Sequence, residues 1–137
     1  MNEFKFKHTI FTPVFNRAEE IKELYQSIIA LDYPKSDFEW LIIDDGSTDN
    51  LKEVIDTFDN SINIRVVHKE NEGIHITRNL GAKLAQGEWF TGIDSDDAIL
   101  PHALKKMHTY IHTYIHTYIH TYITDKQNNG CCRAGYE

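Results

Sequence analysis

Two short acidic segments carry the side chains best suited to chemistry, and one of them is Asp94-Ser95-Asp96-Asp97. In an extended backbone, Asp94 and Asp96 point the same way, and carboxylates held that close repel each other unless a cation joins them. Carboxylate oxygens suit Mg²⁺ or Mn²⁺, and Mg²⁺ commonly pairs one or two carboxylates with substrate phosphates. This spacing alone fits a metal site and a solvated loop equally, and the position of the segment directly after an apolar strand pattern favours the metal site. The alternative is a solvated acidic loop with a helix-capping aspartate.

The other acidic segment is Asp44-Asp45-Gly46-Ser47-Thr48-Asp49. Asp, Gly, Ser and Thr are the residues of turns and helix caps, so a turn followed by an N-cap explains Ser47 to Asp49. The same interpretation explains Asp44 and Asp45 less well, because this pair follows an apolar run that is typical of a buried strand. A carboxylate there is placed to accept hydrogen bonds from a base or a sugar.

A third polar segment, Asn71-Glu72-Gly73, sets a glycine turn before a helix, and Arg78 follows on that helix. Arg78 is placed to neutralise either the acidic segments or a ligand phosphate. Gly81, Ala82 and Ala85 give the same helix a small-residue face that can pack close to a sheet. The sequence has neither the GxGxxG pattern nor a P-loop, so a dinucleotide site is unsupported and nucleotide phosphates would be held by a metal.

The elements that must position these segments alternate between strand and helix patterns. Apolar runs rich in β-formers are separated by segments whose apolar residues recur at helical spacing. This order predicts an α/β fold with a mainly parallel sheet and helices on both faces, which binds ligands at the carboxyl ends of its strands. Gly87 is expected to stop the third helix, and Pro101 to begin a further one. We expect strands at residues 8–14, 38–44, 62–68 and 88–93, and helices at residues 17–31, 49–58 and 74–86.

Composition and charge restrict the class of protein. The length of 137 residues fits one domain, and 41% hydrophobic with 26% charged residues excludes a mainly disordered or fibrous chain. A formal net charge of −7 argues against a nucleic-acid partner bound through a basic face. Cys131 and Cys132 are adjacent, which gives neither a disulfide framework nor CxxC metal spacing. Because there is no secretory signal and no apolar window of about 18–20 residues, the expected location is the cytoplasm.

Together these segments resemble the N-terminal, nucleotide-sugar-binding half of a family 2 glycosyltransferase, whose Rossmann-like fold is called GT-A. The resemblance begins near residue 7 and implies a donor-binding region at 1–107. This region would be truncated after the family's DxD motif, which is Asp94-Ser95-Asp96 here. It also implies transfer of a sugar from a nucleotide-diphosphate donor to an acceptor hydroxyl, with inversion, and a metal that stabilises the departing diphosphate. The matching segments are residues 12–17, 41–49, 71–73, 78–82, 87–88 and 93–97.

The same resemblance implies roles for individual residues. Asp45 would hydrogen-bond the base with Asp44 beside it, and Asp94 would face the ribose. Asp96 would hold Mn²⁺ or Mg²⁺, with Asp97 close by. The family's catalytic base lies in the second half of the domain, which has no counterpart here, so no general base is assigned. The residues implied for the nucleotide-sugar site are Thr12, Pro13, Phe15, Asn16, Asp44, Asp45, Arg78 and Asp94.

The implied partners are a nucleotide-sugar donor, such as a UDP-sugar, and a glycan or lipid-linked acceptor. An acceptor of that kind would bring the chain to the inner face of the membrane as a peripheral protein. The family, together with a gene whose expression is phase-variable, suggests synthesis of a surface polysaccharide or lipopolysaccharide.

Phase-variable expression of the gene is inferred from residues 108–123, which are four perfect copies of His-Thr-Tyr-Ile. A helix would stack the four histidines at i, i+4 spacing and could bind Zn²⁺, whereas Thr, Tyr and Ile favour a strand. A repeated CATA unit explains the pattern more simply, since it reads His-Thr-Tyr-Ile in triplets and then returns to frame. Such a tract changes length by slippage, so we expect phase-variable expression. Residues 124–137 show no apolar period and fit out-of-frame translation.

Three alternatives compete with a glycosyltransferase. The first is a non-catalytic nucleotide-sugar-binding fragment without activity. The second is a phosphatase or receiver-like domain, but those place the key aspartate after the first strand, where Asn16 stands. The third is a histidine-rich metal-binding interaction protein, which rests only on the repeat.

Overall fold

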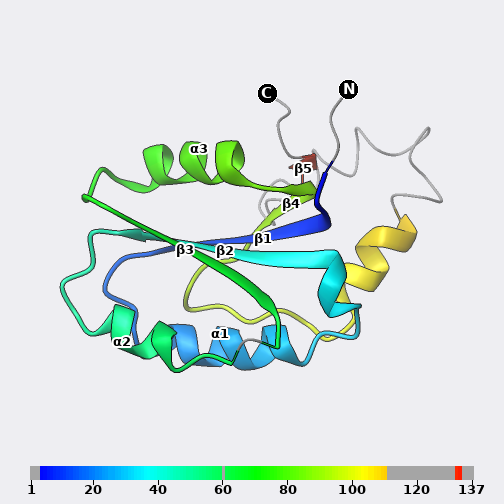
Figure 1. Ribbon diagram of the computed structural model, residues 1–137, viewed down its shortest axis with the longest axis horizontal. Helices are drawn as coiled ribbons and strands as arrows, with labels where there is room; N and C mark the ends of the chain where they lie inside the picture. Colours follow the sequence, from blue (N-terminus) through cyan, green and yellow to red (C-terminus); the bar gives the residue numbers. More distant parts are fainter. Residues whose placement is uncertain (1–3, 60, 111–131, 134–137) are drawn as a thin grey trace.

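The computed structural model describes residues 4–59, 61–110 and 132–133, which form one five-stranded sheet with helices on both faces (Figure 1). The strand order is β3-β2-β1-β4-β5, so the first strand of the chain lies at the centre of the sheet. The strands are β1 (Phe6–Val14), β2 (Phe38–Asp45), β3 (Asn63–Lys69), β4 (Gly87–Gly92) and β5 (Cys132–Arg133). The helices are α1 (Glu20–Ile29), the 3₁₀ turn η1 (Lys35–Asp37), α2 (Leu51–Asp56) and α3 (Ile74–Leu84), and a further helical segment covers 103–110.

The first four strands are parallel. β1 pairs with β2 on one side and β4 on the other, and β3 pairs with β2. Only the short β5 runs antiparallel, against β4, within the described part of the chain. Every residue of β2 is buried, which is typical of a central strand with both faces covered. The predicted α/β fold with a mainly parallel sheet is therefore confirmed, and the ends of the predicted strands shift by one or two residues.

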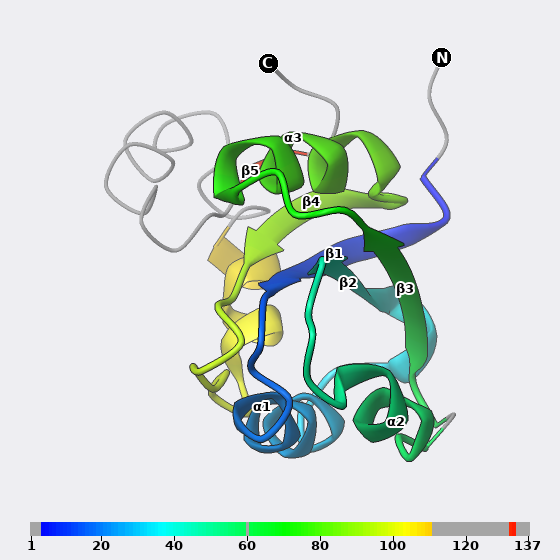
Figure 2. The ribbon, with the colours of Figure 1, turned by 90° about the vertical axis from the view of Figure 1, so that its left-hand side faces the viewer.

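The helices cover the sheet in two layers. Figure 2 shows α1 and α2 on one face and α3 on the other. The apolar residues of α1 recur at helical spacing, which turns one continuous stripe of the helix toward the sheet. Ile21, Leu24 and Ile28 of this stripe are fully buried. The predicted amphipathic pattern thus explains how α1 packs.

α3 comes close to the sheet through a glycine. On this face, Phe11 of β1 stacks on Phe90 of β4 with ring centroids 5.3 Å apart. A Cβ atom at Gly81 would lie 2.5 Å from the Phe11 ring, which is closer than real Cβ atoms approach any neighbour. The small residue is therefore needed for α3 to reach its position, as the small-residue face predicted.

Some helix boundaries differ from the sequence prediction. α3 ends at Leu84, and Gly87 begins β4 instead of stopping the helix. A side chain at residue 87 would collide with the β1 backbone, so this glycine lets the two strands pair closely. Pro101 lies in a turn and the next helical segment begins at residue 103, because the Pro101 carbonyl accepts the Asp32 N–H at 2.7 Å. The first two helices are also shorter than predicted at both ends.

A histidine is buried near the start of β1. His8 is 1% exposed and packs edge-on against Tyr33, with ring centroids 5.3 Å apart. Neither ring nitrogen of His8 has a hydrogen-bond partner among the described residues. Burial, together with His108 and Lys7, lowers the pKa of His8 to about 4. The ring is therefore neutral at pH 7.

The His-Thr-Tyr-Ile repeat enters the described structure only at its beginning. His108, its first residue, lies in the helical segment 103–110, and its Nδ1 atom is 3.4 Å from the Tyr33 hydroxyl. The rest of the repeat, including the three later histidines of the predicted stack, lies outside the described residues. Within residues 124–137, only β5 is described.

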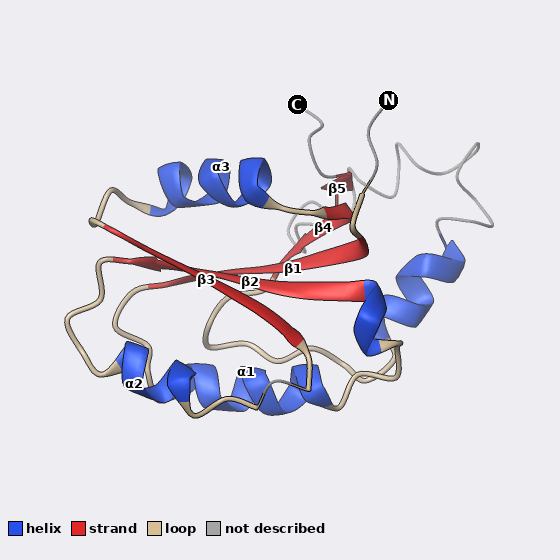
Figure 3. Ribbon diagram, viewed as in Figure 1, coloured by secondary structure: helices blue, strands red, loops and turns tan. Residues whose placement is uncertain are grey.

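The four parallel strands run toward the same end of the sheet, at the left of Figure 3. Their carboxyl ends meet there, and the loops that follow β1, β2, β3 and β4 carry the polar segments singled out in the sequence. No helix in the described part of the chain is long and apolar enough to cross a membrane.

Candidate functional site

A cavity of about 460 Å³ lies at the carboxyl ends of the strands. Its walls come from the loops after β1 and β4, the last residue of β2, and the turn that leads into α3. The cavity brings together five residues predicted for the site, namely Pro13, Phe15, Asp45, Asp94 and Asp96. The full lining is Pro13, Val14, Phe15, Arg17, Asp45, Asn71, Gly73, Ile74, Thr77, Asp94, Ser95 and Asp96.

Asp45, at the end of β2, is the most tightly held carboxylate of the cavity. Its Oδ1 atom accepts hydrogen bonds from Lys69 Nζ at 2.8 Å and from the Glu72 N–H at 2.9 Å. Its Oδ2 atom accepts the Gly73 N–H at 3.1 Å. Burial alone would raise the pKa of Asp45, but these three hydrogen bonds outweigh it and hold the pKa below its ordinary value. The group is therefore a carboxylate anion at neutral pH.

The turn that supplies two of these donors is shaped by glycines. Gly73 has φ +96° and Gly46 has φ +81°, a backbone conformation that side chains rarely adopt. A Cβ atom at Gly46 would lie 2.7 Å from the backbone nitrogen of Asn71, so the loops after β2 and β3 touch at this glycine. Asn71 Nδ2 adds a hydrogen bond to the Asp45 carbonyl at 3.1 Å. The glycine turn noted in the sequence thus builds one wall of the cavity.

The acidic turn, Asp94-Ser95-Asp96-Asp97, follows β4. Carboxylate oxygens of its three aspartates lie within 4.8 Å of one another, and all three side chains are exposed. The segment is not extended as the spacing argument assumed, because the Asp97 N–H donates to the Asp94 carbonyl at 3.0 Å and closes a turn. An exposed set of oxygen ligands at this separation fits a hard divalent cation such as Mg²⁺ or Mn²⁺. Asp94 and Asp96 line the cavity and Asp97 does not.

Three other predicted residues use their polar atoms in hydrogen bonds to other parts of the chain. Thr12 is fully buried, and its hydroxyl oxygen accepts the Trp40 Nε1–H at 2.9 Å. Asp44 Oδ1 accepts the Ser47 N–H at 2.8 Å, and its Oδ2 lies 2.9 Å from His68 Nδ1. None of these residues lines the cavity. Asn16, the third of the predicted residues, bonds the loop after β2 through its Oδ1 atom.

The positive charge in the cavity wall comes from Arg17, which follows Asn16 in the matching segment 12–17 and for which no role was predicted. Its guanidinium is half exposed and lies 3.6 Å from Glu20. Arg78, the predicted cation, is exposed on α3 and does not line the cavity. Arg17 directly follows residues 12–16, so its position just after β1 was the signal in the sequence that could have identified it as a cavity residue. Thr77, buried on α3, gave no such signal in the sequence.

Two large apolar side chains give the cavity an apolar wall beside its acidic residues. Phe15 and Ile74 line it and are each nearly half exposed. They come from the loop after β1 and the first residue of α3. An exposed apolar wall beside carboxylates suits a ligand with a flat ring at one end and a cation-bound anion at the other.

Comparison with known proteins identifies relatives over most of the chain. A family model described as Glycosyl transferase family 2 matches residues 9–133. The poly(ribitol-phosphate) beta-N-acetylglucosaminyltransferase TarS of Staphylococcus aureus is 34% identical over 107 residues, which are 77% of this chain and 19% of that protein. The chain thus spans about a fifth of the length of this curated relative.

Solved structures agree with the sequence relatives. Staphylococcus aureus TarS in complex with UDP-GlcNAc superposes with a TM-score of 0.76 at 32% identity, over 80% of this chain and 32% of that one. A mannosyltransferase from Pyrobaculum calidifontis, in complex with GDP-Man and Mn²⁺, superposes with a TM-score of 0.72 over 80% of this chain and 36% of that one. Its identity is 20%, so that likeness concerns the fold alone.

Proposed function

The chain belongs to glycosyl transferase family 2 and has the Rossmann-like GT-A fold, and on this premise we propose that it binds the nucleotide-sugar donor of a sugar transfer. The observation that carries the proposal is one cavity lined by apolar Phe15 and Ile74 and by acidic Asp94 and Asp96. A nucleotide sugar needs both an apolar and an acidic wall, since its base is a flat ring and its diphosphate binds through a cation. The TarS complex with UDP-GlcNAc supports a donor of this class.

The proposed pose follows the chemistry of the cavity wall. The base lies against Phe15, with Asp45 accepting an N–H from it, and Asp94 accepts from the ribose hydroxyls. Arg17 adds positive charge for the diphosphate. Pro13 contributes backbone to the nucleoside wall.

The remaining residues predicted for this site receive supporting roles in the proposal. Thr12, Asn16 and Asp44 shape the loops through the internal hydrogen bonds described above. Arg78, exposed on α3 and outside the cavity lining, is proposed to lie near the nucleotide.

Asp96, with Asp97 close by, is proposed to hold Mn²⁺ or Mg²⁺. When bound, the cation supplies Lewis-acid stabilisation of the diphosphate that leaves in an inverting transfer. The chain's own contribution is to hold the oxygen ligands at the cavity mouth and to keep the donor oriented. Among the described residues we assign no general base, so activation of the acceptor hydroxyl is left to parts of the protein outside them.

The acceptor is proposed to be a hydroxyl of a glycan or a lipid-linked glycan, in the synthesis of a surface polysaccharide or lipopolysaccharide. This places the chain in the cytoplasm at the inner face of the membrane. The TarS relative supports a polymer as acceptor, since its name describes transfer onto poly(ribitol phosphate).

We further propose that the repeat at 108–123 is encoded by a tetranucleotide tract, and that this chain is an off-frame, truncated product of a phase-variable gene. The four perfect copies support this, because selection on protein sequence alone seldom keeps a tetrapeptide identical. Sequencing the gene across codons 108–123 tests it. A tract of CATA units, with a second frame that continues the domain, is the expected result. Synonymous codons that break the tract would refute it.

The second candidate function is a nucleotide-sugar-binding fragment without activity, and the lack of an assigned general base favours it. Release of UDP from UDP-GlcNAc in the presence of Mn²⁺ and the absence of acceptor separates the two candidates. Turnover above the buffer rate supports catalysis by this chain. Binding without turnover supports the fragment.

Calorimetric titration of UDP into the full chain with Mn²⁺ tests donor binding itself. We expect saturable binding that weakens roughly tenfold or more in the double variant Asp94→Asn/Asp96→Asn, because two carboxylates that would hold the cation are lost. Asp56→Asn removes an exposed carboxylate of α2 and is the matched control with unchanged affinity. If the wild-type chain bound neither UDP nor GDP, the proposal would be overturned.

A further inference from the structure

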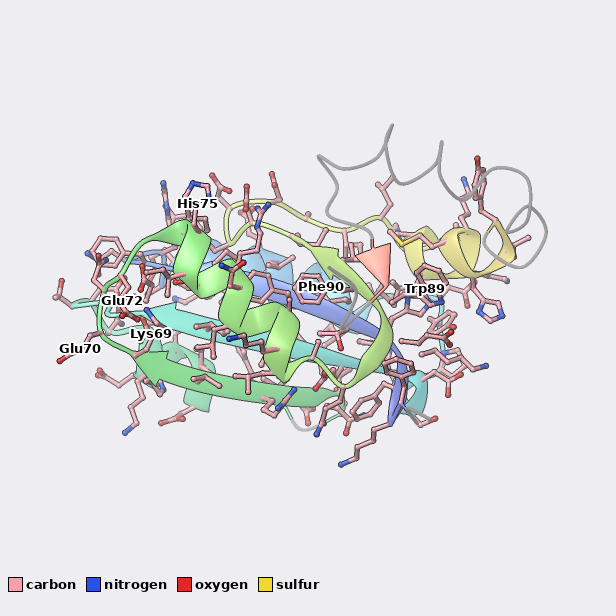
Figure 4. The ribbon with its side chains drawn as sticks, turned by 90° about the horizontal axis from the view of Figure 1, so that it is seen from above. Lys69, Glu70, Glu72, His75, Trp89 and Phe90 are labelled. Carbon is pink, nitrogen blue, oxygen red and sulfur yellow. The ribbon has the colours of Figure 1, made fainter. Side chains whose placement is uncertain are left out.

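Lys69, the last residue of β3, is almost buried beside the cavity, with 11% of its side chain exposed. In the parallel register it stands opposite Asp45, the last residue of β2. Its ammonium group lies 2.8 Å from Asp45 Oδ1, 2.8 Å from Glu72 Oε1 and 2.7 Å from the Glu70 carbonyl. These three acceptors match the three N–H donors of a lysine ammonium. Figure 4 shows Lys69, Glu70 and Glu72 together at the turn that leads to His75 on α3.

Lys69 does not line the cavity, so it reaches a ligand there only through another residue. That residue is Asp45, which does line it. A carboxylate has two acceptor positions on each oxygen. Lys69 and the Glu72 N–H occupy both positions on Oδ1, and the Gly73 N–H occupies one on Oδ2. Among the described residues, the carboxylate therefore keeps one open acceptor position, on Oδ2.

We propose that Lys69 is a positioning residue for the donor's base: it fixes the Asp45 carboxylate so that a single acceptor position is offered to one N–H of that base. The inference deepens the proposed function and rests on it. Lys69 also ties Asp45 to Glu72 in the turn before α3, so the strand end and the turn move as one unit. Without the ammonium, the carboxylate keeps the Glu72 and Gly73 N–H donors, but Oδ1 regains an acceptor position that competes for the same N–H.

The test compares UDP affinity, by calorimetry with Mn²⁺, in the wild-type chain and in Lys69→Met, which keeps the length of the aliphatic stem. We expect roughly tenfold weaker binding, since a charge-assisted hydrogen bond that orders the acceptor is lost. Lys69→Arg keeps the positive charge and is expected to weaken binding by less than roughly threefold. Lys22→Met is the matched control: Lys22 also pairs with a glutamate three residues away, on α1, and its loss leaves UDP affinity unchanged.

A double variant separates positioning from general loss of structure. In an Asp45→Asn background, Lys69→Met is expected to change UDP affinity by less than roughly twofold, because the group it positions has gone. A merely structural role would weaken binding in both backgrounds and would overturn the inference, as would wild-type affinity in Lys69→Met itself. A wild-type chain that binds neither UDP nor GDP is a different result, since it overturns the proposed function on which this inference rests; if only GDP binds, the same comparison is made with GDP.

Discussion

The side-chain oxygen Oδ1 of Asn16 lies 2.7 Å from the backbone nitrogen of Thr48, which joins the loop after β1 to the loop after β2. The same oxygen accepts the Asp49 N–H at 3.3 Å, and the Asn16 N–H donates to Ser47 Oγ at 2.9 Å. Asn16 has φ +54°, a left-handed conformation that asparagine tolerates better than most residues. The residue therefore holds together two loops at the mouth of the cavity.

Replacing Asn16 tests which of its atoms matters. Its side chain acts in these contacts only as an acceptor, so Asn16→Asp keeps them and should change the free energy of unfolding by about 0.5 kcal/mol or less. Asn16→Ala leaves the Thr48 and Asp49 N–H groups without this partner and should cost about 1–3 kcal/mol. Urea denaturation measures both variants. Equal destabilisation by the two substitutions would show that the amide Nδ2 group, and not Oδ1, carries the role.

The acidic turn makes a prediction about Mn²⁺ alone, without nucleotide. Three exposed carboxylates within 4.8 Å should bind the ion weakly but measurably, as seen by the loss of free Mn²⁺ signal in electron paramagnetic resonance. Asp96→Asn removes one charged ligand and should weaken this binding roughly tenfold. Asp59→Asn, an exposed aspartate after α2, should leave it unchanged. Identical titration curves for Asp96→Asn and wild type would exclude Asp96 as a ligand.

The approach of α3 to the sheet predicts an unusual cost for a small substitution. Gly81→Ala would normally stabilise a helix, but its Cβ atom would meet the buried Phe11 ring at 2.5 Å. Overpacking of this kind should lower the free energy of unfolding by about 1–3 kcal/mol. Gly92→Ala, where a Cβ would meet no atom within 4 Å, is the matched control and should be close to neutral. Denaturant midpoints measure both, and a Gly81→Ala chain as stable as wild type would mean that α3 can shift outward freely.

The sequence was sufficient for the four parallel strands, for the helices between them and for the end of the sheet that carries the site, but not for β5. Apolar runs marked the four parallel strands, and the rule that parallel strands end together predicted Asp45, Asp94 and Asp96 at one edge, where the structure has them. What the sequence could not determine was which of two neighbouring side chains faces the cavity. Asp44 and Asp45 point to opposite faces of β2, and only the pairing with β3 decides that Asp45 meets Lys69.

For the same reason, the sequence could not determine which of the two arginines, Arg17 or Arg78, lines the cavity. Arg78 sits on α3, so its direction depends on how that helix is rotated against the sheet, and Gly81 and Phe11 set this rotation. Arg17 lies in the loop after β1, whose path depends on the hydrogen bonds of Asn16. Contacts between residues far apart in the chain, Asn16 with Ser47 and Phe11 with Gly81, decide both positions, and a local pattern does not record them.

The buried His8 predicts how stability depends on pH. Its pKa in the folded chain is about 4, against 6.5 for the free side chain, because burial, His108 and Lys7 disfavour the charged ring while Asp37 opposes them. Below pH 6.5 the unfolded chain takes up a proton at this position that the folded chain does not. Stability should therefore fall as pH drops from 6.5 toward 4, by up to about 3 kcal/mol from this residue.

His8→Phe keeps a ring beside Tyr33 and removes the titrating group, so it should flatten the dependence of unfolding free energy on pH within this window. Urea denaturation at half-unit steps from pH 4 to 7 measures the slope, which for one proton approaches about 1.4 kcal/mol per pH unit. Asp45, whose folded pKa is also lowered, loses its contribution only as pH falls below its ordinary value of 3.8, so it lies outside the window. His75→Phe, on the exposed side of α3, should leave the slope as in wild type. If His8→Phe retained the full wild-type slope, another histidine would be responsible for it.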